Sequence, residues 1–525
     1  MTSVSPRTRR RLVLAAVCLA ALCMPLSFTG PAIAIPSIAF DLHGSPLALA
    51  WISNAFMLSF GSCLMAAGAL ADRHGRKRLF LLGLSVFTAA ALALAYAPSI
   101  AVLGLLRAVQ GLGCALALSS GLAALAQEFD GAARARAFSL IGTSFGTGLA
   151  FGPIAAGSLV ASLGWRSLFA LTALAGLAAL ILAACTMRES RDPQAAGLDI
   201  AGALSFTGAL SLLTYGLLQA PHSGWSSPSS CVLLAGAALL LALFLLVERR
   251  HARPMLDLSL FRLPAFAGVQ LLAAAPAFSY VVLLVLLPAR LIGIEGYSAY
   301  AAGAMMLALS APMLVLPILA GLAAQRLLAA HICSAGLLLT SGGLLWLSLC
   351  APGVPAATLL GPLLLIGAGI SLPWGLMDGL AVSVVPVERA GMAAGIFNTT
   401  RVAGEGIALA IVAALLATFT ATALRALSGV DSSAAVLAAP LLAIGDLRQA
   451  AALLPHASVQ ELAQAYGAAF RHLLQVLAAI STASALLLAF LRQPAGTFAC
   501  SRHGTHERFV TRAELLRLDQ DRTSL

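Results

Sequence analysis

The sequence carries little charge and lacks the residue patterns on which enzymes and metalloproteins depend. Only 10% of its 525 residues are charged, whereas soluble domains carry about 25%. So few charges cannot cover the surface of a soluble protein of this length. The nine cysteines form no Cys-x-x-Cys or Cys/His spacing, and no Gly-x-x-x-x-Gly-Lys-Ser/Thr phosphate-binding loop occurs. We therefore expect no disulfide framework, no metal, no cofactor, no enzyme activity and no direct use of ATP.

Hydrophobic residues make up 60% of the chain and are gathered in long blocks. A block of ~18 apolar residues is long enough to cross the hydrocarbon of a bilayer as a helix. In lipid every backbone amide must be satisfied internally, which a helix achieves alone. The sequence therefore predicts an all-α polytopic membrane protein with fourteen transmembrane helices. The expected spans are 12–36, 49–71, 79–97, 101–125, 138–161, 166–187, 198–220, 229–247, 264–288, 300–323, 332–350, 354–384, 391–420 and 472–491.

The orientation follows from the basic residues, because loops rich in Lys and Arg stay in the cytoplasm. With a cytoplasmic N-terminus, 24 of the 31 Lys and Arg residues fall inside and only five outside. This predicts that segments 1–11 and 492–525 are cytoplasmic and that 421–470 is an extracytoplasmic loop, helical over 446–470. The same distribution explains the net charge of +11 without a nucleic-acid partner. The alternative for the first apolar run is a cleaved signal peptide with an Ala-x-Ala site at 32–34.

An ordered glycine and charge pattern joins the second and third expected spans. Gly68 and Gly75 permit close approach and a tight turn, and Asp72 places an acid at a helix end among basic residues. An ordinary positive-inside loop would explain the basic residues but not the pattern that precedes them. The full stretch reads Gly68-Ala-Leu70-Ala-Asp72-Arg73-His74-Gly75-Arg76-Lys77-Arg78.

Two further patterns lie within the fourth and fifth spans. Arg107 is followed by Gln110 and by glycines 111 and 113, although an arginine this near a helix end could also extend outward to the interface. The fifth span contains small residues four apart, which let helices pack closely, and a proline that would bend it. These residues are Gly148, Gly152, Pro153 and Gly157.

Together these stretches resemble motifs A, B and C of the major facilitator superfamily, and most of all its fourteen-span drug:proton antiporters. The resemblance covers residues 12–492 and implies two six-helix bundles, 12–187 and 264–491, with inserted spans at 198–247. It also implies that the motif A residues Gly68, Asp72, Arg73, Gly75 and Arg76 form a conformational latch. A broken copy of motif A at 321–331, with Gln325 in the Asp position, favours an internal duplication.

One departure from that branch concerns the proton. Ser27 stands where the branch has an aspartate in the first span. An ionisable residue at mid-membrane costs ~2.5–3.5 kcal/mol and is functional by default, so the candidates become Glu405, Asp378, Arg401 and Arg107. Glu405 lies fourteen residues beyond Gly391, which at ~1.5 Å per residue is about 20 Å deep. Arg401 precedes it by one turn, so a permanent structural ion pair is the alternative, and Asp378 could be merely interfacial.

The sequence thus predicts a secondary transporter that exports a small amphipathic molecule in exchange for protons by alternating access. We expect it in a bacterial-type inner membrane, with lipid, protons and the small molecule as its partners. Two alternatives stay open at this point. The first is a proton-independent facilitator or uptake carrier for a metabolite, which the missing acid at Ser27 permits. The second is a membrane sensor that binds a ligand without moving it.

Overall fold

The structure is a computed structural model that describes residues 5–129, 131–191, 199–250, 256, 258–324, 326–385, 390–427 and 430–490. The described residues contain helices and no strands. Fourteen of the helices are long and apolar enough to cross a membrane, which confirms the predicted all-α fold with fourteen spans. The expected cytoplasmic tail 492–525 and Gln325 lie outside the described residues.

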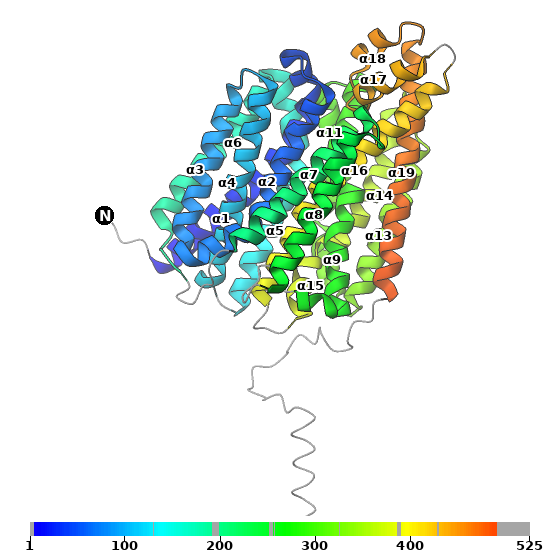
Figure 1. The fold of residues 1–525 in the computed structure, drawn as a ribbon. Helices are drawn as coiled ribbons and strands as arrows, with labels where there is room; N and C mark the ends of the chain where they lie inside the picture. The colour runs from blue at the N-terminus through cyan, green and yellow to red at the C-terminus, as the bar shows by residue number, and fades with distance from the viewer. Residues whose placement is uncertain are drawn as a thin grey trace, which may run out of the picture.

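The first six helices pack together as one bundle, drawn in blue to cyan (Figure 1). Within it α1 packs along α5 and α6, and α2 packs along α4. Serine hydroxyls cap three of these helices: Ser5 accepts from the Thr8 N–H, Ser45 from the Ala48 N–H and Ser99 from the Val102 N–H. The helices are α1 (Pro6–Leu42), α2 (Pro46–His74), α3 (Arg76–Ala95), α4 (Ile100–Glu128), α5 (Gly131–Leu163) and α6 (Arg166–Thr186).

The next two helices form an antiparallel pair that leans on both halves of the molecule. Helices α7 (Ile200–Ser223) and α8 (Pro228–Arg250) pack on each other, and α7 also contacts α2 and α16. Most of the apolar side chains of α8 are exposed, as expected for a helix that faces lipid. These are the two additional spans that the sequence predicts between the bundles.

The second bundle contains helices that are interrupted, often beside a proline. A proline lacks the N–H that the helix ladder needs, and π turns follow Pro276 and Pro288 while a 3₁₀ turn contains Pro312. The expected span 354–384 divides after Pro373 into two helices. The elements are η1 (Leu258–Arg262), α9 (Pro264–Pro276), η2 (Ala277–Val281), α10 (Val282–Pro288), η3 (Ala289–Ile294), α11 (Ala299–Ser310), η4 (Ala311–Leu314), α12 (Leu316–Ala323), α13 (Ala329–Ser348), α14 (Ala356–Trp374), α15 (Met377–Ser383), α16 (Ala390–Arg425) and α19 (Val459–Phe490).

The segment 421–470 is more helical than the sequence indicates. Its first residues continue α16 to Arg425, and α19 begins at Val459 rather than near residue 472. Between them lie α17 (Ser432–Ala443), which was not expected, and α18 (Leu447–Leu453). The run of Ala, Val and Leu in α17 explains its burial, because seven of its twelve residues are buried. Both helices lie at the end of the molecule opposite the start of α1 (Figure 1).

The two bundles meet where small residues let backbones approach. A Cβ atom at Gly61 of α2 would lie 2.7 Å from the Ala403 nitrogen of α16. A Cβ atom at Gly303 of α11 would lie 2.5 Å from the Pro153 oxygen of α5. Only glycine fits at such crossings. The α2/α16 and α5/α11 contacts therefore define the interface across which the two bundles face each other.

Candidate substrate and proton site

A cavity lies between the two bundles, and we call it the Glu405 cavity after its acidic residue. Both bundles contribute to its wall, through α1, α2 and α5 on one side and η2, α14 and α16 on the other. Among the residues that line it, Glu405 alone carries a charge. The apolar wall includes Met24, Met57, Phe28, Phe56, Phe60, Phe145 and Trp374. Flat aromatic rings and flexible methionines fit apolar ligands of varied shape.

Glu405 is positioned by the close crossing of α16 and α2. Its side chain is only 7% exposed, and glycines flank it on both sides. A Cβ atom at Gly406 would already touch the Met57 Cβ atom at 3.4 Å. Among the described residues no side chain lies within hydrogen-bond or ion-pair distance of its carboxylate. The carboxyl group is therefore enclosed by apolar walls, where its charged form is costly.

Arg401 does not bind Glu405 in this conformation. Its guanidinium forms an ion pair with Asp378 at 3.3 Å and donates to the Asn398 Oδ1 atom at 2.7 Å. It also lies 5.9 Å from the ring of Phe145, which belongs to the other bundle. The Asp378 side chain is 58% exposed, so its ion pair is worth little in stability. The structure thus brings Arg401 and Asp378 together, and Glu405 has no ion-pair partner among the described residues.

Arg107 is completely buried and does not extend outward to the interface. Its Nε atom donates to the Ile52 carbonyl at 2.9 Å, and its Nη1 atom donates to Gln110 Oε1 at 2.6 Å. The guanidinium lies 4.3 Å above the ring of Phe56, a residue that lines the Glu405 cavity. Arg107 therefore stands directly behind the cavity wall and fixes α4 against α2.

The motif A loop is held together by two carboxylates. Asp72 accepts from Arg76 Nε at 2.9 Å and Nη2 at 2.7 Å, which joins the end of α2 to the start of α3. Glu189, just beyond α6, accepts from the backbone N–H groups of Lys77 and Arg78 at 3.1 and 3.2 Å. A carboxylate at a helix N-terminus satisfies donors that the helix itself cannot.

Gly75 is the residue that permits this arrangement. Its φ of 115° lies in the region that favours glycine. A Cβ atom there would also lie 2.5 Å from the Glu189 Oε1 atom. Sequence reasoning found Gly75 from its pattern but missed Glu189, because 114 residues separate the two and no motif links them. Arg73 and His74 are the basic residues in the last turn of α2.

The motif C glycines of α5 contact two different partners. A Cβ atom at Gly148 would lie 2.8 Å from the Leu22 oxygen of α1, and one at Gly152 would lie 2.5 Å from Thr29 Oγ1. Further along, a Cβ atom at Gly157 would overlap the Ala299 oxygen of α11. The first two glycines therefore seat α5 on α1, and Gly157 and Pro153 seat it on the opposite bundle.

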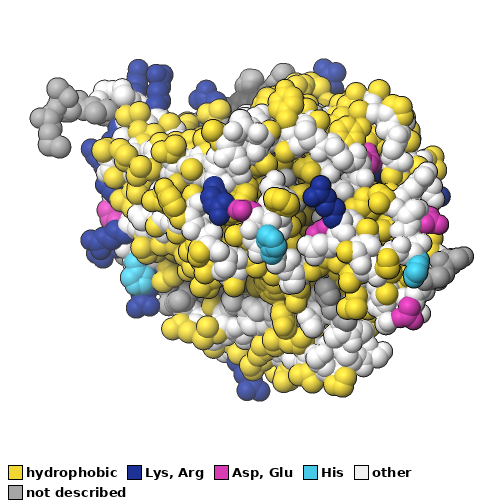
Figure 2. Space-filling view, turned by 90° about the horizontal axis from the view of Figure 1, so that it is seen from above, with side chains coloured by type: hydrophobic (Ala, Val, Ile, Leu, Met, Phe, Trp, Pro, Cys, Tyr) yellow, Lys and Arg dark blue, Asp and Glu magenta, His cyan; other side chains and the backbone are white. Residues whose placement is uncertain are grey.

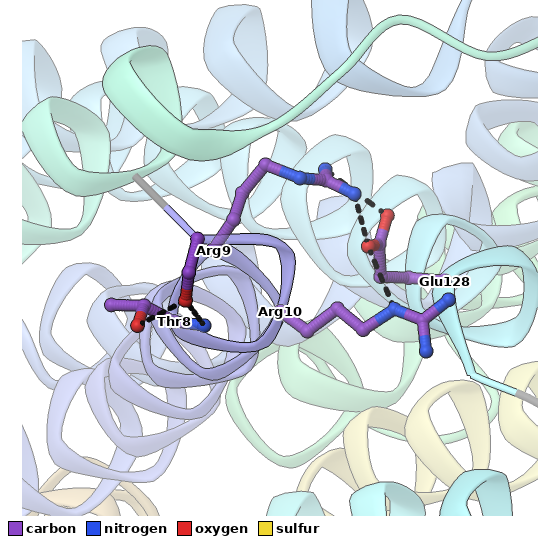
Figure 3. A network of polar contacts seen from close by, with 5 residues as sticks. Thr8, Arg9, Arg10 and Glu128 are labelled. Carbon is purple, nitrogen blue, oxygen red and sulfur yellow. Dashed lines mark hydrogen bonds and ion pairs between the residues drawn. The ribbon is translucent and has the colours of Figure 1, made fainter. Parts of the chain in front are cut away.

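A polar network at the start of α1 was not found from the sequence. Glu128, the last residue of α4, binds Arg9 at 2.5 Å and Arg10 at 3.5 Å (Figure 3). The hydroxyl of Ser5 caps α1 by accepting from the Thr8 N–H. Arg9 and Glu128 are 119 positions apart, so no spacing in the sequence could indicate these ion pairs. They tie the start of α1 to α4 at the same end as the motif A loop.

Two bundles of six spanning helices and two inserted spans, with a cavity between the bundles that contains one buried acid, define a polytopic membrane transporter. The sequence matches the Major Facilitator Superfamily over residues 17–409. This chain belongs to that family.

Several bacterial relatives are similar over most of their length. The multidrug resistance protein Stp of Mycobacterium tuberculosis (strain CDC 1551 / Oshkosh) is 34% identical over 394 residues, which is 75% of this chain and 73% of that protein. The tetracenomycin C resistance and export protein of Streptomyces glaucescens is 31% identical, over 77% of this chain and 75% of that protein. The drug efflux pump JefA of M. tuberculosis is 30% identical, over 75% and 77% respectively.

Solved structures share the fold at low sequence identity. A bacterial homolog of the human lysosomal transporter Spinster superposes with a TM-score of 0.62 at 17% identity, covering 93% of this chain and 99% of that chain. The peptide transporter POT in complex with sulfate gives a TM-score of 0.59 at 16% identity, covering 93% and 99%. These likenesses agree with the two-bundle architecture.

Proposed function

We propose that this transporter exports small amphipathic molecules in exchange for protons, with Glu405 as the group that carries the proton. The observation that carries the proposal is the Glu405 cavity, an aromatic and methionine-lined space with one buried carboxylate that has no partner among the described residues. The cavity has only about 340 Å³ of empty space in this conformation, so the bundles would move apart to let its apolar rings hold the body of a drug-like molecule. The carboxylate would bind either a proton or a polar group of the substrate. Export is supported by the three relatives, which are named as resistance, export and efflux proteins.

In this proposal Arg401 pairs with Glu405 in another conformation of the transport cycle, and not in the present conformation. Here Arg401 is occupied by Asp378 and Asn398, and Glu405 lies one helical turn further along α16, within reach of a rearranged side chain. When Arg401 turns to Glu405, the carboxylate would be held charged and would release its proton. When Arg401 returns to Asp378, protonation becomes favourable again because the cavity is apolar.

The motif A loop acts in this proposal as a latch between conformations. Asp72 and Glu189 join the ends of α2, α3 and α6 in one network of hydrogen bonds. This network holds in one conformation and breaks when the bundles move into the other. Motif C supplies the other moving surface, because Gly148 and Gly152 seat α5 on α1 while Gly157 contacts α11. Residues 12–187 and 264–491 are the bundles that move, and 198–247 are the inserted spans.

We place the protein in a bacterial-type inner membrane with both termini cytoplasmic. The α17 end carries only scattered charged side chains among hydrophobic and uncharged ones (Figure 2). The basic cluster Arg73, Arg76, Lys77 and Arg78 lies at the opposite end, beside the start of α1. This asymmetry supports a cytoplasmic motif A loop and an extracytoplasmic segment 421–470.

A proton-independent facilitator is the rival function, and Ser27 favours it. Ser27 is 2% exposed and is not among the residues that line the Glu405 cavity, and the α1 residues that do line it are Met24, Pro25 and Phe28. Helix α1 therefore supplies no acid to this cavity. A flux measurement in proteoliposomes separates the two functions. With an imposed pH gradient and a fluorescent dye such as rhodamine 6G, antiport accumulates dye against its own gradient. Equilibration of the dye without accumulation would contradict the proposal and leave the facilitator.

A further inference from the structure

A second pocket lies between the bundles, at the end where α17 sits, and we call it the α17 pocket. Its walls come from α1 and α2 of the first bundle, from α7, and from α10, η3 and α16 of the second. Helix α17 closes it on one side with Pro440 and Ala443. It shares no lining residue with the Glu405 cavity.

The two spaces are stacked one helical turn apart along the same three helices. On α2 the Glu405 cavity is lined by Met57 and the α17 pocket by Ser53. On α16 the corresponding residues are Glu405 and Leu409, and in the helix that follows Pro276 they are Val281 and Val285. Four residues advance an α-helix by about 6 Å. The α17 pocket therefore continues the path that begins at the Glu405 cavity.

The α17 pocket contains two buried polar groups without partners. Ser53 and Asn54 are 3% and 4% exposed and both line the pocket. The Asn54 amide nitrogen donates to the Ala50 carbonyl at 2.9 Å, which leaves its Oδ1 atom as an acceptor. Among the described residues neither Asn54 Oδ1 nor Ser53 Oγ has a hydrogen-bond partner. A buried polar atom left unpaired costs about 1–3 kcal/mol, so a ligand that satisfied these atoms would be favoured.

Helix α17, which covers the pocket, is held in place by a close backbone contact. The turn after α17 contains Gly445, whose φ is 84°. A Cβ atom on it would lie 2.5 Å from the Ala289 oxygen of η3, and Ala289 itself lines the pocket. The segment 421–470 thus reaches down onto the second bundle and encloses space that α2 and α16 alone would leave open.

We infer that the α17 pocket is a second binding site for the exported molecule, which it receives after the Glu405 cavity and before release. It selects ligands that have an apolar body and a hydrogen-bond donor, because Leu218, Val285 and Val412 supply the wall and Asn54 supplies the acceptor. The inference rests on the proposed function for the class of ligand. Occupancy of the pocket is measurable at equilibrium, without any proton gradient.

Cysteine protection tests the site in the full chain, reconstituted in lipid nanodiscs with the nine native cysteines changed to serine. Ala413→Cys reports the α17 pocket, and Leu149→Cys reports the Glu405 cavity. We expect rhodamine 6G, a cationic aromatic dye with N–H donors, to slow N-ethylmaleimide labelling at least threefold at both cysteines. Tetraphenylphosphonium, which has no N–H, should protect Ala413→Cys less than it protects Leu149→Cys.

Variants of Asn54 then identify the polar group that binds the dye. Asn54→Leu should abolish protection of Ala413→Cys and keep protection of Leu149→Cys, whereas Asn54→Asp retains an acceptor and should protect both. Gln449→Leu makes the same amide-to-alkyl change on an exposed residue of α18 and should alter neither. Absence of protection at Ala413→Cys while Leu149→Cys is protected overturns the second site alone. Absence of protection at both overturns the second site and also contradicts the proposed substrate class.

Discussion

Arg107 is a positive charge enclosed entirely by protein. Among the described residues no carboxylate forms an ion pair with it, and its Nη2 atom has no hydrogen-bond partner. Its contacts are one carbonyl, one amide and the face of Phe56. Such a charge is costly to bury without a counter-ion, so its position against the cavity wall is better explained by transport than by stability.

Arg107→Met separates these two explanations. Methionine keeps a long side chain beside Phe56 and removes the buried charge, and apolar replacement of buried charges is often neutral or stabilising by about 1–4 kcal/mol. We expect an unchanged or higher unfolding midpoint, together with at least a tenfold loss of dye transport. Gln110→Met serves as the comparison, because it strands the Arg107 Nη1 donor and should lower the midpoint. Arg107→Met with a lower midpoint and full transport would refute this assignment.

Individual contacts were the least predictable part of the molecule. The sequence singled out Arg401 beside Glu405 by their spacing, but the actual partner of Arg401 is Asp378. That pairing depends on the break between α14 and α15 after Pro373, which hydropathy alone does not reveal. The cavity-lining phenylalanines could not be told from ordinary membrane-facing ones, since both lie in apolar runs. The buried position of Arg107 follows only from the packing of α4 on α2.

Among the helices, α5 shows most clearly how small residues set the spacing between elements. Gly148 has no room for a side chain, because the Leu22 carbonyl of α1 occupies that space. Gly142, less than two turns earlier on the same helix, has no neighbouring atom within 4 Å of a built Cβ position. Packing therefore requires a glycine at position 148 of this helix and does not require one at position 142.

Substitution to valine at these two glycines tests the packing role of motif C. Gly148→Val should force α5 away from α1 at a cost of about 1–3 kcal/mol, with a lower unfolding midpoint and slower transport. Gly142→Val should keep both close to wild type. Fluorescence-detected size-exclusion after heating measures the midpoint, and equal midpoints for the two variants would show that the Gly148 contact is unimportant.

The proposed latch role of the motif A loop, which joins α2 and α3, is tested by changing Asp72. Asp72→Asn removes the charge that binds Arg76, but a partly exposed pair is worth only about 0–1 kcal/mol, so the protein should stay folded. Transport should fall at least fivefold, because the hydrogen-bond network of the motif A loop no longer stabilises one conformation. Asp72→Glu keeps the charge and should reduce transport less. Transport by Asp72→Asn at the wild-type rate would remove the latch role from this loop.

Elements were predicted well wherever they are long and apolar, and less well at interruptions. Fourteen spans follow from hydropathy because each needs only composition and length. Helix α17 was missed, since its twelve residues are too short to span a membrane and the surrounding segment is polar. Its burial depends on packing against α16 and α7, which links residues far apart in the sequence.

The two ends of the molecule are proposed to face opposite sides of the membrane. One accessibility measurement tests this orientation. Ser432 is exposed at the start of α17, and the proposed orientation places it outside the cell. In a variant without native cysteines, Ser432→Cys should react with an impermeant maleimide on intact cells, whereas His74→Cys, in the motif A loop, should react only after permeabilisation. The reverse pattern would invert the topology, and with it the side from which the Glu405 cavity is loaded.

The proposed proton antiport requires one group that binds and releases the proton, and Glu405 is the acid placed between the bundles. Glu405→Gln mimics the protonated carboxyl group permanently, so it should still bind and exchange substrate but lose coupling. Glu461→Gln changes an exposed acid at the start of α19 and is the matched control.

The direct measurement is dye flux in proteoliposomes that contain Glu405→Gln. With a pH gradient, wild type and Glu461→Gln should concentrate rhodamine 6G, and Glu405→Gln should show no accumulation. With equal pH on both sides, Glu405→Gln should exchange labelled for unlabelled dye at a rate within about threefold of wild type. Accumulation of dye by Glu405→Gln against its gradient would contradict the role of Glu405 as the proton carrier.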